Sequence, residues 1–246
     1  MLQIITVLFI LFITQTNAQL IKEIKTEPNS CGIDCHFNVT NSTLYIQVNE
    51  TIEYLPLLDQ TITQLQIEGN LQRNLFSFQH YKSIQTIIIN TNKILKGMFS
   101  KMNIQKVVIK ENVQEIEELS FYQCKELTEV QIDKNSQIKT IDNFSFQDCV
   151  NLKSFHIPKG LNCFSEKIFD GCDSLQKLTI DDKNELYSVK QNVLFSKDGK
   201  TLIFYPKGLN HHNKHRASRG PFHLRQKTQS PSHIPISEGR LLLRCL

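Results

Sequence analysis

The hydrophobic positions of this chain repeat in one short pattern. Three apolar residues recur with a spacing of three and then two, and this triplet occurs six times. The triplets are Ile62/Leu65/Ile67, Ile84/Ile87/Ile89, Ile104/Val107/Ile109, Leu127/Val130/Ile132, Leu152/Phe155/Ile157 and Leu175/Leu178/Ile180. Their last members are separated by 22, 20, 23, 25 and 23 residues. One triplet arises easily by chance, whereas six at a nearly constant interval indicate a repeat protein.

Each triplet ends in an alternation of apolar and polar residues, which predicts a short strand with its apolar side facing inward. An aromatic block opens the stretch back to the next strand, at Phe76/Phe78, Phe99, Leu119/Phe121, Phe144/Phe146 and Ile168/Phe169. A single coil cannot bury its own apolar edge, so the coils must stack and share one core. The sequence therefore predicts an α/β-type repeat solenoid over residues 61–208, with a parallel concave β-sheet and an irregular or short helical convex side.

Three cysteines fall at the same point of three coils, namely Cys124, Cys149 and Cys172, and Tyr81 and Met102 fall there in two others. Stacking would place these side chains in one interior column. A disulfide or metal column is the alternative, but Tyr and Met cannot serve as thiols. A buried free thiol behaves as a small hydrophobe, so we interpret the column as packing.

Two segments carry a family resemblance: SFYQCKELTEVQI (120–132) and SFQDCVNLKSFHIPKGL (145–161). They resemble the BspA-type leucine-rich repeats of bacterial and protist surface proteins, which run roughly I-x-x-I-x-x-x-A-F-x-x-C-x-x-L-x-x-I-x-I-P. The resemblance spans about residues 60–208. Ser120, Ser145 and Ile168 replace the family's small Ala. The resemblance implies a right-handed leucine-rich-repeat coil, and a role in attachment to host proteins, matrix proteins or other cells.

The outward strand residues form three columns across the predicted concave sheet, where solenoids make extended contacts. Ile88 and Val108 would be adjacent exposed aliphatics in the central column, which makes them our candidate anchor. The alternative is that β-branched residues simply suit strands. Mixed polar columns favour a protein or glycan partner over a buried small molecule. The central column is Gln66, Ile88, Val108, Gln131, His156 and Thr179, and the flanking ones are Gln64, Thr86, Lys106, Glu129, Ser154, Lys177 and Glu68, Asn90, Lys110, Asp133, Pro158, Asp181.

The two ends of the chain differ from the repeat. Residues 19–60 are expected to form an N-terminal cap, in which Cys31 and Cys35 form a plausible disulfide, although sequence alone does not fix the connectivity. The repeat stops at Gly208. Residues 209–246 contain seven Lys/Arg residues and one acid. We expect a basic disordered tail, and a shifted reading frame is the alternative.

Composition and targeting signals bear on the compartment. The chain has a net charge of +4, and its excess of basic residues lies in the tail, so the near-neutral body gives no case for nucleic-acid binding. The apolar run from Ile4 to Ile13 and the small residue Ala18 predict a signal peptide over residues 1–18, with a buried N-terminal segment as the alternative. The run is short for a transmembrane helix. A secreted or cell-surface glycoprotein is expected, with acceptor sequons at Asn38, Asn41, Asn49 and Asn143.

No motif for phosphate binding, zinc hydrolysis, calcium loops or a nucleophile elbow occurs in the sequence. We therefore expect no catalytic residues, no metal site and no cofactor. The leading hypothesis is a secreted or cell-surface binding protein that mediates adhesion or recognises a protein or glycan. A truncated, non-binding member of the family is the alternative, and an enzyme on an atypical scaffold is a third hypothesis.

Overall fold

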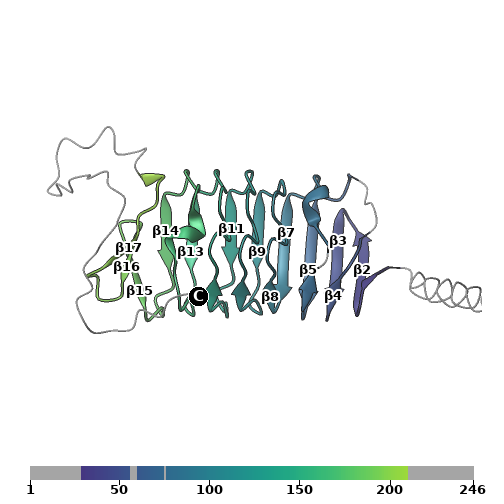
Figure 1. Ribbon diagram of the computed structural model, residues 1–246, viewed down its shortest axis with the longest axis horizontal. Helices are drawn as coiled ribbons and strands as arrows, with labels where there is room; N and C mark the ends of the chain where they lie inside the picture. The colour runs from purple at the N-terminus through teal and green to yellow at the C-terminus, as the bar shows by residue number, and fades with distance from the viewer. Residues whose placement is uncertain (1–28, 56–59, 75, 210–246) are drawn as a thin grey trace, which may run out of the picture.

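The computed structural model describes residues 29–55, 60–74 and 76–209. The expected signal peptide, residues 1–18, and all of the expected tail except Leu209 lie outside these described residues. Figure 1 shows the described part as an elongated body, with its strands standing side by side in a nearly straight row along the long axis.

The row consists of a sheet of seven strands and of a separate pair of strands, which lies next to the sheet along the long axis (Figure 1). Within the described residues, the sheet has the order β1-β2-β3-β5-β7-β9-β11, and β13 and β14 form the ladder. The strands are β1 (Ser30–Gly32), β2 (Cys35–Thr40), β3 (Thr43–Val48), β5 (Gln64–Gly69), β7 (Thr86–Thr91), β9 (Lys106–Ile109), β11 (Glu129–Ile132), β13 (Ser154–Ile157) and β14 (Lys177–Ile180).

The apolar triplets stack as the repeat predicts. Ile67 of β5 pairs with Ile89 of β7, Ile89 with Ile109 of β9, and Ile109 with Ile132 of β11, all in parallel. Ile157 pairs with Ile180 in the second ladder. The predicted repeat solenoid with a parallel sheet is therefore confirmed.

Five short strands follow long strands in the sequence, and they pair in parallel with one another rather than with the long strands. They are β4 (Thr51–Ile52) and β6 (Arg73–Asn74), which pair with each other, and β8 (Lys93–Ile94), β10 (Glu115–Ile116) and β12 (Thr140–Ile141). Five coils thus contribute one long and one short strand each, from β3 with β4 to β11 with β12, whereas the described residues after β13 form no short strand before β14.

The expected short helical convex side is barely present. Helix in the described residues is limited to two 3-10 turns, η1 (Phe78–His80) and η2 (Glu166–Phe169). The physical reason is that backbone groups here bond to the neighbouring coil instead of within their own turn: the Phe99 N–H donates to the Ser120 carbonyl (2.9 Å) and the Phe121 N–H to the Ser145 carbonyl (2.8 Å).

Left-handed residues also prevent a helix from extending on this side. Leu119 and Gln123 have φ of 59° and 56°, and Phe144 and Asp148, at the equivalent points of the next coil, have φ of 62° and 58°. Each such non-glycine residue costs roughly 1–2 kcal/mol relative to right-handed helix. Three of them, Gln123, Phe144 and Asp148, donate from their N–H groups to carbonyls of the next coil, so the convex side is a stack of turns.

An aromatic column runs through the core. The rings of Phe78, Phe99, Phe121, Phe146 and Phe169 follow one another with centroid separations of 5.4, 5.5, 5.0 and 5.8 Å. All five side chains are buried. Beside this column, the free thiols of Cys124, Cys149 and Cys172 are buried and donate to the carbonyls of Phe99, Phe121 and Phe146, respectively.

Antiparallel strands close both ends of the described solenoid. At the N-terminal end, β1 pairs with β2 and β2 with β3, and a disulfide joins Cys31 to Cys35. At the C-terminal end, β15 (Tyr187–Lys190), β16 (Val193–Ser196) and β17 (Leu202–Phe204) form an antiparallel sheet. Phe204 packs against Phe169 with ring centroids 5.8 Å apart, so this sheet covers the last ring of the aromatic column.

Candidate functional site

The outward surface of the long strands, which we call the strand face, brings four residues of the predicted central column together. Gln66 pairs with Ile88, Ile88 with Val108, and Val108 with Gln131. Neighbouring strands lie about 4.8 Å apart, so the four side chains form one continuous row. The other two, His156 and Thr179, pair in the β13–β14 ladder, where the His156 Nδ1 lies 3.0 Å from the Thr179 hydroxyl.

Tyr45 belongs to the same row and was missed by the sequence analysis. It pairs with Gln66 on one side and with Asn38 on the other, and its side chain is 38% exposed. The signal was present in the alternation of Leu44, Ile46 and Val48, which places Tyr45 on the outer surface. Because the region before residue 60 was assigned to a cap, β3 was not recognised as a parallel neighbour of β5 over six residues.

The polar members of the row are held by their own strands. The Gln66 amide donates to Glu68 (2.6 Å), and the Gln131 amide donates to Glu129 (2.6 Å). Glu129 also lies 3.4 Å from the Lys106 ammonium. Such exposed ion pairs contribute about 0–1 kcal/mol each, so they orient side chains more than they stabilise the fold. The half-buried side chains of Ile88 and Val108 therefore lie between two amides that are held in place by hydrogen bonds.

One member of the predicted flanking column does not face outward. Pro158 directly follows β13 and is buried, unlike Lys110 at the equivalent point after β9, which is exposed. The Asn184 amide donates to the Pro158 carbonyl (2.9 Å), and both residues are buried. The column prediction was wrong at Pro158, because here the chain packs against the buried Asn184 instead of facing outward.

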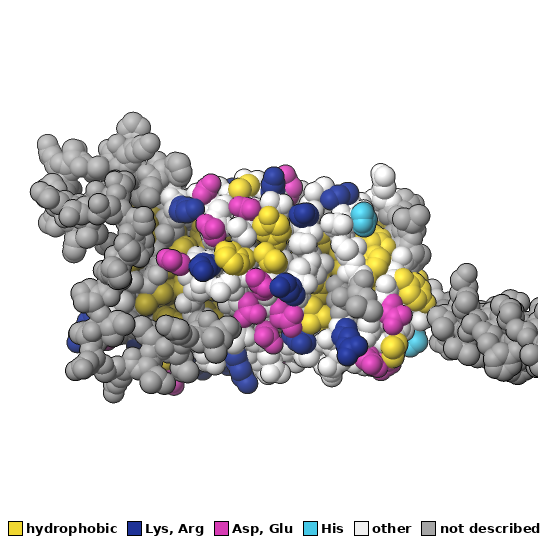
Figure 2. Space-filling model, in the orientation of Figure 1, with side chains coloured by type: hydrophobic (Ala, Val, Ile, Leu, Met, Phe, Trp, Pro, Cys, Tyr) yellow, Lys and Arg dark blue, Asp and Glu magenta, His cyan; other side chains and the backbone are white. Residues whose placement is uncertain are grey.

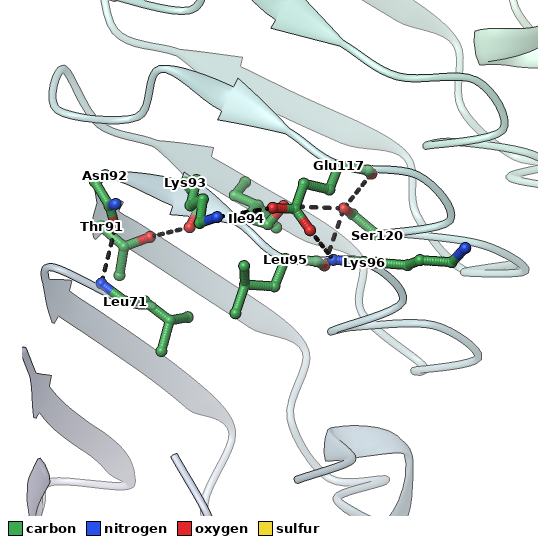
Figure 3. Close-up of polar contacts among 9 residues, drawn as sticks. All are labelled: Leu71, Thr91, Asn92, Lys93, Ile94, Leu95, Lys96, Glu117 and Ser120. Carbon is green, nitrogen blue, oxygen red and sulfur yellow. Dashed lines mark hydrogen bonds and ion pairs between the residues drawn. The ribbon is translucent and has the colours of Figure 1, made fainter. Parts of the chain in front are cut away.

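A second polar region lies beside the short strands. Acidic side chains gather near the middle of the face seen in Figure 2, with Lys and Arg side chains beside them. Glu117 forms an ion pair with Lys93 (3.1 Å) and accepts from the Lys96 N–H (2.9 Å), while the buried Ser120 hydroxyl donates to the carbonyls of Ile94 and Leu95 (Figure 3). These contacts link consecutive coils.

Burial and neighbouring carboxylates raise the pKa values of two acidic side chains in this region. Burial, followed by the nearby Glu117 carboxylate, raises the pKa of Glu115 above its ordinary value of 4.5, and the same two causes raise the pKa of Asp142 above 3.8. A depression of about 430 Å³ adjoins Asp142 and Glu118. No group of three or more His, Cys, Asp or Glu residues within the described ranges is arranged to hold a metal ion.

The four sequon asparagines occupy different surroundings. Asn38, on β2, is exposed in the row beside Tyr45, and Asn41 is exposed in the β2–β3 turn with φ of 48°. Asn49 is exposed directly after β3. Asn143 is half-buried, and its Oδ1 accepts no hydrogen bond from the described chain. The first three are therefore sterically open to a glycan in the folded protein.

None of the helices formed by residues 29–55, 60–74 and 76–209 has the length and apolar character needed to cross a bilayer.

The comparisons with known proteins concern the repeat itself. The family model described as "BspA type Leucine rich repeat region" matches residues 32–128 and 69–200 in six copies. No curated protein matches the chain.

Solved structures are similar to part of the chain at low identity. The pneumococcal vaccine antigen PcpA is 16% identical with a TM-score of 0.49, and the similarity covers 75% of this chain and 58% of that one. A leucine-rich cell surface protein from Faecalibacterium prausnitzii is 18% identical with a TM-score of 0.44, covering 74% and 62%. A leucine-rich repeat protein from Eubacterium ventriosum is 16% identical with a TM-score of 0.46, covering 72% and 50%.

The chain thus spans between half and two thirds of the length of these solved structures. The family model covers well over half of the chain and confirms the resemblance carried by residues 120–132 and 145–161. The chain belongs to the BspA-type leucine-rich repeat family.

Proposed function

We propose that this chain is an extracellular binding protein whose strand face holds a protein partner around Ile88 and Val108. The observation that carries this proposal is the row Tyr45–Gln66–Ile88–Val108–Gln131, aligned in register across five parallel strands. At about 4.8 Å per strand, the row spans roughly 19 Å.

The composition of the row fits a protein interface. Its centre is aliphatic, Tyr45 supplies an aromatic ring near one end, and the amides of Gln66 and Gln131 flank the aliphatic pair. Protein interfaces commonly have an apolar or aromatic centre surrounded by polar groups that exclude water. The rigid sheet presents these side chains without a cost for ordering loops, which favours affinity.

An extracellular location is part of the proposal. It is supported by the apolar run from Ile4 to Ile13 with Ala18 after it, by the exposed sequon residues Asn38 and Asn41, and by the disulfide between Cys31 and Cys35. Disulfides persist in oxidising compartments. N-terminal sequencing of the protein exported by a eukaryotic host tests this part, and we expect the mature chain to begin at Gln19.

Substitution of the aliphatic pair tests the binding face. Ile88→Glu and Val108→Glu place a carboxylate at the centre of the row, and each should weaken binding to cultured cells or to a plate coated with extracellular-matrix protein at least about tenfold. Ile33→Glu is the matched control, because Ile33 is 54% exposed in the turn before β2 and lies away from the row.

The outcomes separate the hypotheses. Loss of binding in both strand-face variants but not in Ile33→Glu supports the proposal. Unchanged binding in both strand-face variants would refute the assignment of the face. A folded wild-type chain that binds neither cells nor matrix protein would instead support the truncated, non-binding member of the family.

A further inference from the structure

We infer that a row of amide side chains at one end of the long strands forms a binding groove for a neutral, hydroxyl-rich polymer, that is, an uncharged polysaccharide. This groove lies apart from the central column and does not depend on the proposed protein partner. It has a volume of about 430 Å³, and its lining consists of Gln47, Asn49, Glu68, Gly69, Asn70, Asn90, Asn92, Asn112, Gln114 and Gln137.

Strand register generates the row. Asn49, Asn70 and Asn92 are the first residues after β3, β5 and β7, whose last residues Val48, Gly69 and Thr91 pair with one another. One position before the last residue of each strand lie Gln47, Glu68 and Asn90, which also pair in register. Six polar side chains thus form a grid of two rows across three coils, with a repeat of about 4.8 Å along the axis.

The chemistry of the grid points to hydroxyl groups. A primary amide carries two donors and an acceptor side by side, which matches sugar hydroxyls because each of these also donates and accepts. Among the lining residues only Glu68 is charged, and its carboxylate already accepts from Gln66. A polyanion would require a row of cations. A protein partner would require an apolar or aromatic anchor, and the lining side chains include none.

Some amide oxygens of the groove already accept hydrogen bonds within the protein, and at least one does not. The Asn92 Oδ1 accepts from the Leu71 N–H (2.8 Å) and so ties one coil to the preceding one (Figure 3). The Asn90 Oδ1 is buried at the groove and accepts no hydrogen bond from the described chain. Leaving a buried acceptor unpaired is unfavourable, so a change in the Asn90 rotamer that brings this amide to a ligand hydroxyl would be favoured.

The coils approach closely at Gly69, which is one of the residues that line the groove. A Cβ at this position would lie 1.9 Å from the Val48 carbonyl oxygen, and Gly69 has φ of 115°. The absence of a side chain lets the Gln47 amide lie against the Gly69 backbone, because its Nε2 would be 3.0 Å from a Cβ there. The regular coil repeat favours a linear chain with repeating units over a single small molecule.

Affinity electrophoresis tests the inference. The purified, unglycosylated chain is run in native gels containing dextran, mannan or soluble β-glucan, because Asn49 heads a sequon and its own glycan would occupy the groove. We expect at least one neutral polysaccharide to retard the wild type, with little change in 0.5 M salt since the contacts are uncharged. The double variant Gln47→Ala/Asn70→Ala should weaken retardation at least about fivefold.

Two controls make the result specific. Gln131→Ala removes an exposed amide from the strand face outside the groove, and Ile88→Glu disrupts the proposed protein site. Both should bind the polysaccharide like wild type, and circular dichroism should show that the double variant is folded. No retardation by any neutral polysaccharide, retardation by the polyanion heparin alone, or an equal loss in Gln131→Ala would overturn the inference. A loss in Ile88→Glu alone would assign polysaccharide binding to the central column instead.

Discussion

Removing one ring from the middle of the aromatic column tests how the solenoid is held together. Phe121 is fully buried, with the Phe99 ring 5.5 Å away on one side and the Phe146 ring 5.0 Å away on the other. Phe121→Ala removes both stacked contacts and leaves a cavity between two coils. Buried Phe→Ala changes cost about 3–5 kcal/mol, which is a large share of the roughly 5–15 kcal/mol that stabilises a typical domain.

The expected loss can be measured by urea or thermal denaturation followed by circular dichroism. A domain of 150–250 residues loses about 2–4 °C in Tm per kcal/mol, so a loss of about 4 kcal/mol should lower Tm by about 8–16 °C. Phe144→Ala is the matched control in the neighbouring coil. The Phe144 ring is half-buried and lies outside the column, with the Lys167 ammonium 5.8 Å from its centroid, so this change should cost only about 1 kcal/mol.

A double-mutant cycle separates stacking from simple loss of volume. Phe121→Ala and Phe146→Ala should show a coupling of about 0.5–1.5 kcal/mol, because their rings are stacked at an interplanar angle of 12°. The reasoning fails if Phe121→Ala and Phe144→Ala lower stability equally, since the column would then contribute nothing beyond an ordinary surface ring.

Three further outcomes follow from the structure. The buried thiols of Cys124 and Cys149, whose pKa values burial raises (to about 12 for Cys124), should resist iodoacetamide at pH 8 in the folded protein and react once urea unfolds it. Gly69→Ala should destabilise the protein by at least about 1 kcal/mol more than Gly97→Ala, because a Cβ at Gly69 meets backbone while one at Gly97 meets nothing within 4 Å. Glu115→Gln should raise the free energy of unfolding at pH 7, where the folded protein holds a carboxylate that burial and Glu117 disfavour.

The upward direction of the Glu115 pKa shift determines the pH range in which Glu115→Gln stabilises the protein. A raised pKa means that the folded state binds a proton more tightly than the unfolded state. The penalty at Glu115 is therefore present above its folded pKa and disappears as the pH falls below 4.5, the ordinary value for Glu. The advantage of Glu115→Gln should therefore vanish near pH 4, and an advantage that grows on acidification would contradict it. Labelling of the folded thiols at the rate of the unfolded ones, or equal stability of the two glycine variants, would contradict the other two predictions.

The interior of the fold could be predicted because the stacking of coils restricts which residues can occupy the inward positions. Ile89 and Ile109 pair in register, so each must be apolar and similar in size to the residue above and below it. This requirement repeats in every coil and makes the period visible in a single sequence. The thiol column was predictable for the same reason, since Cys124 and Cys149 occupy equivalent points beside Phe121 and Phe146.

The path of the backbone on the convex side was not predictable. Gln123 and Phe144 are left-handed although neither is Gly or Asn, and their N–H groups donate to carbonyls of the next coil. Helix propensity describes hydrogen bonds within one segment, so it does not predict hydrogen bonds to a neighbouring coil. The same dependence on a neighbour explains the role of β3, because a strand of six residues reads as a cap until its parallel partner β5 is known.

The candidate sites could be predicted only in part, and the reason lies in the symmetry of the repeat. An inward residue must suit both neighbouring coils, so selection for stability alone makes inward columns uniform, as in the aromatic column. An outward residue has no such constraint, and stability alone leaves its column mixed. A run of like residues on the outside therefore requires another cause. Ile88 beside Val108 is one such run, and Asn49, Asn70 and Asn92, each directly after a strand of the sheet, are another. Ile and Val suit strands in any case, and Asn is common where a strand ends in a turn, so the Ile88→Glu and Gln47→Ala/Asn70→Ala variants decide whether either run binds a partner.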